Sequence, residues 1–155
     1  MKFSASGSFV VDHETEKVLC VNSINTSGIG FPLGKLNEGE SPMVGAVRET
    51  FEETGHVIYV DSITKAFTHF VGEHTNQVFL AQSIAKGKSL EDNVVTLWLT
   101  PEELIKSSFP KYLDFNYRCL KHFADQGVII LDDKFDELYK FIVDKHRHFD
   151  KLESK

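Results

Sequence analysis

The stretch Gly34–Gly55, GKLNEGESPMVGAVRETFEETG, contains the most specific pattern in the chain. Seven positions follow the spacing G-x5-E-x7-R-E-x-x-E-E-x-G, namely Gly34, Glu40, Arg48, Glu49, Glu52, Glu53 and Gly55. With each residue type used at about 7%, chance produces this spacing on the order of 10⁻⁸ times per starting position. The pattern therefore predicts a defined structural and chemical role.

The same stretch predicts a helix from about Pro42 to Thr54. Ser41 is a favourable N-cap, proline suits the first helical position, and Gly55 can take the left-handed conformation that ends a helix. At about 100° per residue, Glu49, Glu52 and Glu53 fall within one sector of the helix wheel. The residues expected on the opposite, packed side are Met43, Val44, Val47, Thr50 and Phe51.

Three carboxylates on one helix face repel one another by roughly 0.2–0.5 kcal/mol per pair. A hard divalent cation, which prefers oxygen ligands, would remove that repulsion. Arg48 lies beside Glu52 and can hold a carboxylate in a fixed orientation. A solvated acidic surface is the ordinary explanation for an acidic pair. Here the caps, the glycine-containing entry loop and the complete spacing together favour a metal site.

Residues 34–56 resemble the Nudix box, the sequence pattern of the Nudix hydrolase superfamily. Thr50 and His56 depart from the family pattern, which usually has aliphatic residues at both positions, and these departures concern packing. The resemblance implies an α/β fold, the Nudix-type α/β/α sandwich with a mixed sheet and extra C-terminal helices. We expect one domain over residues 1–155, with residues from about 128 to 155 as a C-terminal helical extension.

The resemblance also implies a hydrolase that acts on acid anhydrides in phosphorus-containing compounds. It uses Mg²⁺, with Mn²⁺ as the alternative, and the expected metal ligands are Gly34 through its carbonyl group, Glu49, Glu52 and Glu53. The expected catalytic residues are Arg48, Glu52, Glu53 and Glu91. For the base that activates water, the sequence leaves Glu53, Glu73 and Glu91 open. Acidic residues suit this role only if the fold brings them to the metal.

The expected partner is a small nucleotide: a nucleoside triphosphate, a nucleotide sugar such as ADP-ribose, or a dinucleoside polyphosphate. Candidates for stacking on its base are Phe31, Phe67 and Phe70, for which core packing is the competing explanation. The 5′ end of RNA is the alternative substrate, since FPLGK at 31–35 resembles the F-P-x-G-K of decapping and dinucleoside-polyphosphate members. A non-catalytic nucleotide sensor is a third reading, although such modules usually lose the box glutamates that are present here.

Composition limits the other classes of function. The chain has 155 residues, of which 41% are hydrophobic and 26% charged, as in ordinary soluble globular proteins. No apolar run is long enough for a membrane span, and the N-terminus has no signal-peptide pattern. The net charge of −6 argues against general nucleic-acid binding. Cys20 and Cys119 form neither a disulfide framework nor a metal-binding spacing, so we expect a cytoplasmic protein. The C-terminal helices leave a homodimer open.

The remaining pattern predicts a mixed or antiparallel sheet followed by helices. The expected strands are 3–11, 17–22, 57–60, 63–71, 77–84 and 94–99, and the expected helices start near 100 and cover 110–126 and 132–149. We expect the first two strands to form a hairpin, and 63–71 to pair with 77–84 across a polar turn. Residues 25–30 and 34–39 are expected to be loops, because glycine and polar residues dominate them.

Overall fold

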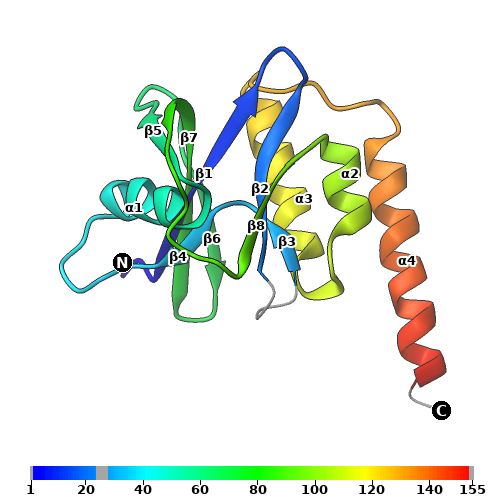
Figure 1. Cartoon of the computed structure of the whole chain (residues 1–155). Coiled ribbons are helices and arrows are strands. Elements are labelled where there is room, and N and C mark those ends of the chain that lie inside the picture. The colour runs from blue at the N-terminus through cyan, green and yellow to red at the C-terminus, as the bar shows by residue number, and fades with distance from the viewer. Residues whose placement is uncertain (1, 24–27, 154–155) are drawn as a thin grey trace.

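The computed structural model describes residues 2–23 and 28–153. Its elements, in order, are β1 (Ala5–Asp12), β2 (Lys17–Ser23), β3 (Gly28–Gly30), β4 (Leu33–Lys35), α1 (Pro42–Thr54), β5 (His56–Val60), β6 (Phe67–Val71), β7 (His74–Lys86), β8 (Val94–Leu99), α2 (Pro101–Ser107), α3 (Pro110–Asp125) and α4 (Phe135–Glu153). Helix α1 lies on one side of the strands, and α2, α3 and α4 lie on the other (Figure 1). This is the expected mixed α/β fold with additional C-terminal helices.

Strand β1 connects the parts of the sheet. It pairs in parallel with β7, from Ala5 opposite Asn76 to Val10 opposite Ala81. On its other edge it pairs antiparallel with β4 and, near its end, with β2. A side chain at Gly7 would overlap the carbonyl oxygen of Pro32, so glycine permits this close approach. The residues that lead into α1 therefore include the strand β4, which is held against β1.

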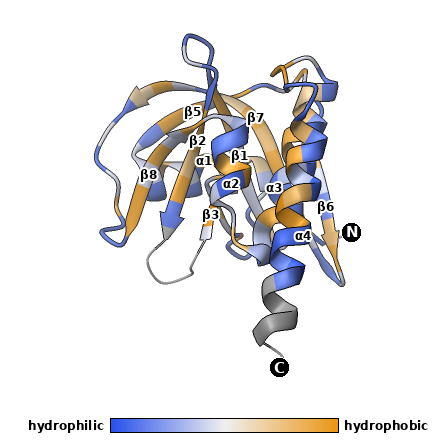
Figure 2. Ribbon diagram, turned by 90° about the vertical axis from the view of Figure 1, so that its right-hand side faces the viewer, coloured by the Kyte–Doolittle hydropathy of each residue, from blue (hydrophilic) through white to orange (hydrophobic). Residues whose placement is uncertain are grey.

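The main core lies between the strands and the C-terminal helices. The ring of Phe9 on β1 stacks on Phe123 of α3 with centroids 4.4 Å apart and lies 5.3 Å from Phe31. Phe135 and Ile142 of α4 are buried in the same cluster. Apolar residues run along the strands and recur along the coloured part of α4 (Figure 2). Helix α4 thus contributes to the core.

Several predicted elements are confirmed. Helix α1 has the predicted bounds, β1 and β2 form the predicted hairpin, and β6 pairs antiparallel with β7. Strand β8 also begins and ends where the sequence predicts. These elements have strong local signals in the form of caps, turn residues and β-branched runs.

Other expectations were wrong. Loops were expected over 25–30 and 34–39, but residues 28–30 form β3, and residues 34 and 35 belong to β4; residues 25–27 lie outside the described part of the chain. Both strands have three residues and form because β2 and β1 offer them partners. Strand β6 begins at Phe67 instead of residue 63, because the Asp61 carboxylate accepts hydrogen bonds from the Ile63 amide and the Thr64 hydroxyl and shapes a turn.

Both cysteines are free and buried. Burial raises the pKa of Cys20 to about 12 and the pKa of Cys119 well above its ordinary value. Within residues 2–23 and 28–153, none of the helices combines the length and the apolar content that crossing a bilayer requires.

Candidate active site

Helix α1 begins and ends at the residues that the sequence selects. The Ser41 side chain accepts a hydrogen bond from the Val44 amide at 3.3 Å, and Gly55 ends the helix with φ of +78°. The packed side is confirmed for Val47 and Thr50, and the hydroxyl groups of Thr50 and Ser8 lie 2.6 Å apart. Met43 and Val44, also expected there, are instead 42% and 57% exposed, whereas Gly45 and Ala46 are buried.

Arg48 is the centre of the polar network on α1. Its Nε and Nη2 donate to the two carboxylate oxygens of Glu40 at 2.7 and 2.8 Å. Its Nη1 donates to Glu49 at 2.8 Å and to Glu52 at 3.1 Å, and Nη2 also reaches the Lys35 carbonyl at 2.9 Å. One guanidinium group therefore sets the positions of three carboxylates and one carbonyl group.

Two carboxyl groups in this network, those of Glu40 and Glu49, have pKa values shifted in opposite directions. Hydrogen bonding from Arg48 lowers the pKa of Glu40 to about 2, so this carboxyl group is ionised at neutral pH. The same bonds raise the pKa of Arg48 above its already high value. Glu49 behaves differently, because burial raises its pKa although Arg48 acts in the opposite direction. A further cation next to Glu49 would favour its charged form.

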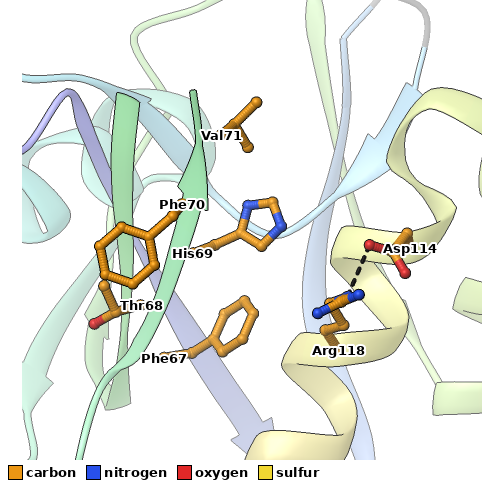
Figure 3. A pocket seen from close by; sticks show the side chains of 7 residues that line it. All are labelled: Phe67, Thr68, His69, Phe70, Val71, Asp114 and Arg118. Atoms are coloured by element: carbon orange, nitrogen blue, oxygen red, sulfur yellow. Dashed lines mark hydrogen bonds and ion pairs between the residues drawn. The ribbon is translucent and has the colours of Figure 1, made fainter. Parts of the chain in front are cut away.

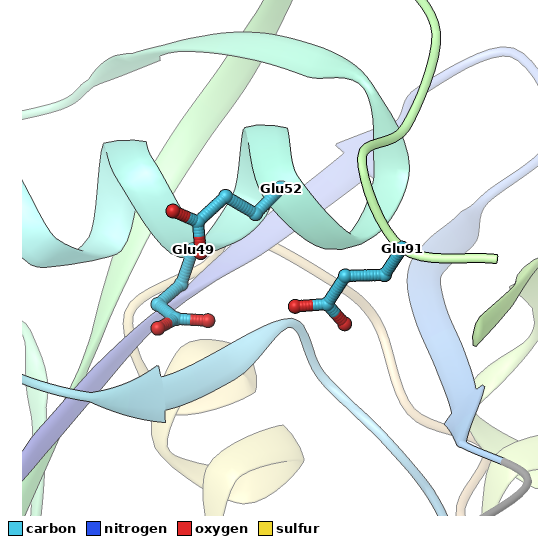
Figure 4. Close-up of side chains that lie close together, drawn as sticks. All are labelled: Glu49, Glu52 and Glu91. Carbon is cyan, nitrogen blue, oxygen red and sulfur yellow. The ribbon is translucent and has the colours of Figure 1, made fainter. Parts of the chain in front are cut away.

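Glu49, Glu52 and Glu91 form the acidic cluster (Figure 4). Each contributes one carboxylate oxygen, and these oxygens lie within 4.8 Å of one another. Glu49 and Glu52 come from α1, whereas Glu91 comes from the segment between β7 and β8. Of the loop residues left open by the sequence, Glu91 reaches the cluster, whereas Glu73 is exposed in the turn between β6 and β7.

Glu53 is buried, unlike the other carboxylates of the acidic face. It is 8% exposed, and its Oε1 accepts a hydrogen bond from the Leu33 amide at 3.0 Å. The pKa of Glu53 is raised to about 8, mainly by burial and next by the charge of Glu49. The face of α1 that meets β1 and β4 is therefore the face that carries Glu53.

The donor set fits a hard divalent cation. The cluster offers oxygen atoms alone, which Mg²⁺ and Mn²⁺ prefer over the nitrogen and sulfur ligands of zinc sites. The backbone of Gly34 lies directly against Glu49, because a Cβ atom at Gly34 would overlap that carboxylate. The residues that could hold a metal ion are Glu49, Glu52 and Glu91, with Gly34 and Glu53 adjoining them.

The predicted aromatic residues do not gather at this cluster. Phe31 and Phe67 are 4% and 9% exposed and belong to the main core, whereas Phe70 is 60% exposed. Phe67 and Phe70 line a groove of about 420 Å³ between β6 and α3, whose other wall carries Asp114 and Arg118 (Figure 3). This groove and the acidic cluster are built from different elements.

Sequence reasoning missed the backbone groups that hold the site. The Leu33 amide fixes Glu53, and the Lys35 carbonyl accepts from Arg48. Backbone groups occur at every residue and give no residue-type signal, so only the approach of β4 to α1 reveals them.

Comparison with known proteins identifies relatives of the chain. A family model described as the NUDIX domain matches residues 1–123. An 83-residue stretch is 37% identical to the m7GpppN-mRNA hydrolase dcap-2 of Caenorhabditis elegans. This match covers 52% of this chain and 11% of that protein. A 102-residue stretch is 28% identical to a MutT-like protein of Streptomyces ambofaciens, covering 65% of this chain and 66% of the relative. The chain thus matches about a tenth of the first relative's length and just under two thirds of the second's.

Two solved structures share the fold. A NUDIX hydrolase from Nitrosomonas europaea superposes with a TM-score of 0.65 at 19% identity, covering 81% of this chain and 90% of that one. An Ap4A hydrolase binary complex from C. elegans gives a TM-score of 0.61 at 18% identity, with coverage of 78% and 98%. Likeness at this level of identity concerns the fold alone.

Proposed function

The chain belongs to the NUDIX family, and on this premise we propose that it is a Mg²⁺-dependent pyrophosphohydrolase. The substrate is a small nucleoside diphosphate derivative, such as a nucleoside triphosphate, a nucleotide sugar or a dinucleoside polyphosphate. The bond cleaved is a phosphoanhydride.

The observation that carries this proposal is the acidic cluster of Glu49, Glu52 and Glu91. Three glutamate oxygens within 4.8 Å of one another would repel a phosphate group as well as each other. The carboxylates would hold Mg²⁺, which when bound would offset their negative charge, polarise the phosphorus and lower the pKa of a water molecule. Glu49 and Glu52 are the proposed ligands from the helix, together with the carbonyl group of Gly34.

The other residues of the site have supporting or proton-transfer roles in this proposal. Arg48 orients Glu49 and Glu52, because a planar guanidinium group fixes the direction of each hydrogen bond. Glu53 joins the ligands through Oε2, since Oε1 accepts from Leu33. Glu91 faces the helix carboxylates from a separate segment. In this proposal it helps to hold the metal ion and is also the general base that removes a proton from the attacking water.

The 5′ end of RNA is the second candidate substrate. It is favoured by the 37% identity over 83 residues to a protein named as an mRNA hydrolase. An RNA 5′ end and a small nucleotide present the same polyphosphate to the cluster. They differ in the length of the polynucleotide that the surrounding surface must hold, so product analysis can separate them.

The test incubates the protein and Mg²⁺ with a panel of nucleotides and of capped and triphosphorylated RNAs, and identifies products by mass. Release of inorganic pyrophosphate indicates a triphosphate substrate. Two nucleoside-phosphate products indicate a dinucleoside polyphosphate, and one nucleoside monophosphate with one sugar phosphate indicates a nucleotide sugar. Glu52→Gln should lower turnover by about 100-fold or more, since it removes a ligand. Glu137→Gln, at an exposed position of α4, is the matched control. A folded protein that yields no product from the whole panel would instead be a nucleotide-binding module.

A further inference from the structure

The segment between β7 and β8 is joined to the C-terminal end of α1 by backbone hydrogen bonds. The Gly87 amide donates to the Gly55 carbonyl at 2.7 Å, and the Leu90 amide donates to the Glu52 carbonyl at 2.9 Å. The last carbonyl groups of a helix have no partner within the helix. This segment supplies such a partner to the Glu52 carbonyl, bonds to the residue that follows the helix, and places Glu91 next to the last turn of α1.

Gly55 makes this contact possible in two ways. Its φ of +78° is a conformation that glycine adopts readily and other residues rarely do. In addition, a Cβ atom at Gly55 would overlap the Gly87 carbonyl oxygen and lie 3.0 Å from the Ser89 nitrogen. The position that ends α1 must therefore also lack a side chain for the segment to approach.

Electrostatic repulsion alone would separate the segment between β7 and β8 from α1. Glu91 faces the carboxylates of Glu49 and Glu52, and like charges at this distance repel. The segment thus needs an attachment that does not depend on charge. The two backbone hydrogen bonds provide it, one to Glu52 in the last turn of α1 and one to Gly55 directly after the helix.

We propose that Gly55 and the amide of Leu90 position Glu91 in the metal site. They are positioning residues, because they act through Glu91 and touch neither metal nor substrate. The inference rests on the proposed function, since it concerns the same site. It adds that Gly55, at the end of α1, attaches a segment that lies more than thirty residues further along the chain.

The first test measures the dissociation constant of Mn²⁺ for the free protein by electron paramagnetic resonance. Leu90→Pro removes the amide that bonds to Glu52, and we expect Mn²⁺ affinity to fall about tenfold or more. Leu90→Ala keeps the amide and alters a side chain that is 66% exposed, so its affinity should equal that of the wild type. Equal affinity in Leu90→Pro and Leu90→Ala would overturn the proposal.

The second test separates the contact from backbone strain. Gly55→Ala introduces both strain at positive φ and the overlap with Gly87. Gly127→Ala introduces the same strain at φ of +77°, where no atom lies within 4 Å of the new Cβ atom. We expect both variants to lose stability, but only Gly55→Ala to lose Mn²⁺ affinity. Similar losses of Mn²⁺ affinity in both variants would contradict a positioning role.

A double-mutant cycle shows whether the effect passes through Glu91. In a Glu91→Gln background, Leu90→Pro should cause no further loss of Mn²⁺ affinity. An undiminished loss in that background would overturn the proposal. If the wild type binds Mn²⁺ and Glu49→Gln weakens binding but Glu91→Gln does not, the inference fails while the proposed function stands. If the folded wild type binds no Mn²⁺, the proposed function itself fails.

Discussion

Arg48 holds Glu40 through a two-point contact, Nε to Oε2 at 2.7 Å and Nη2 to Oε1 at 2.8 Å. Glu40 precedes the helix, and its carboxylate also accepts a hydrogen bond from the Asn37 amide at 3.1 Å. Because both sides of the guanidinium group are fixed, Nη1 can point only toward Glu49 and Glu52. The entry loop therefore controls the orientation of the acidic cluster through one planar side chain.

Arg48→Lys should disrupt this control although the charge is kept. An ammonium group cannot bond Glu40 at two points and also reach Glu49, Glu52 and the Lys35 carbonyl. We expect Mn²⁺ affinity to fall about tenfold or more and the free energy of unfolding to fall by about 1–3 kcal/mol. Arg118→Lys, in an exposed pair with Asp114, is the control and should change stability by less than about 1 kcal/mol. Unaltered metal binding in Arg48→Lys would show that Arg48 has no orienting role.

Gly34→Ala should displace Glu49. The added methyl group would overlap the Glu49 carboxylate, which can move only by breaking its bond to Arg48. We expect weaker Mn²⁺ binding in a titration and a loss of about 1–3 kcal/mol in stability. At Gly30→Ala the nearest atom, Oδ1 of Asn116, lies 3.5 Å away, so this control should bind Mn²⁺ normally. Equal behaviour of the two variants would contradict the close contact at Gly34.

The buried Glu53 should make the metal-free protein less stable as pH rises. Its pKa is about 8 in the folded state and about 4.5 when unfolded, so between these values the folded state binds more protons. Stability then falls with increasing pH. Its contribution is complete below pH about 4.5 and is lost as pH rises through about 8. Urea unfolding in a chelator should show this decline in the wild type relative to Glu53→Gln.

Added Mg²⁺ should reduce the pH dependence, because a bound cation favours the carboxylate form. A stability difference between wild type and Glu53→Gln that is constant over this pH range would contradict the raised pKa. Glu137→Gln, at an exposed site, controls for the loss of one surface charge.

Helix α4 should contribute to the stability of the whole fold. Ile142 is 7% exposed in the main core, so Ile142→Ala should lower the free energy of unfolding by about 2–5 kcal/mol. The neighbouring Phe141 is 67% exposed, and Phe141→Ala should change it by less than about 0.5 kcal/mol. Urea denaturation of both variants tests this, and similar values would indicate that α4 is not packed as described.

Local signals made α1 predictable to its last residue, because Ser41, Pro42 and Gly55 each act on the backbone next to them. The orientation of the helix was not predictable in the same way. It depends on Gly45, where a side chain would meet Leu36 and the Ser6 hydroxyl group, so the helix packs through its small residues. A reading of helical periodicity gives weight to large apolar residues and therefore selected Met43 and Val44 for the packed side.

The acidic cluster was predicted in part for a related reason. Glu49 and Glu52 follow from spacing on one helix, whereas Glu53 turns toward Leu33 and Glu91 takes the third place. From the sequence, Glu73 and Glu91 are equivalent loop carboxylates. They differ in the structure because β7 extends to Lys86, so that the residues after it, including Glu91, lie at the end of α1. Long-range backbone hydrogen bonds hold them there. Contacts of this kind depend on sheet register, which residue types specify only through burial.

The two buried thiols, Cys20 and Cys119, have a practical consequence. Only the thiolate reacts readily with maleimide reagents, and burial keeps both native cysteines protonated. A spin label or dye attached to a new cysteine, for example in Phe141→Cys on α4, would therefore report from one site in the otherwise unmodified sequence.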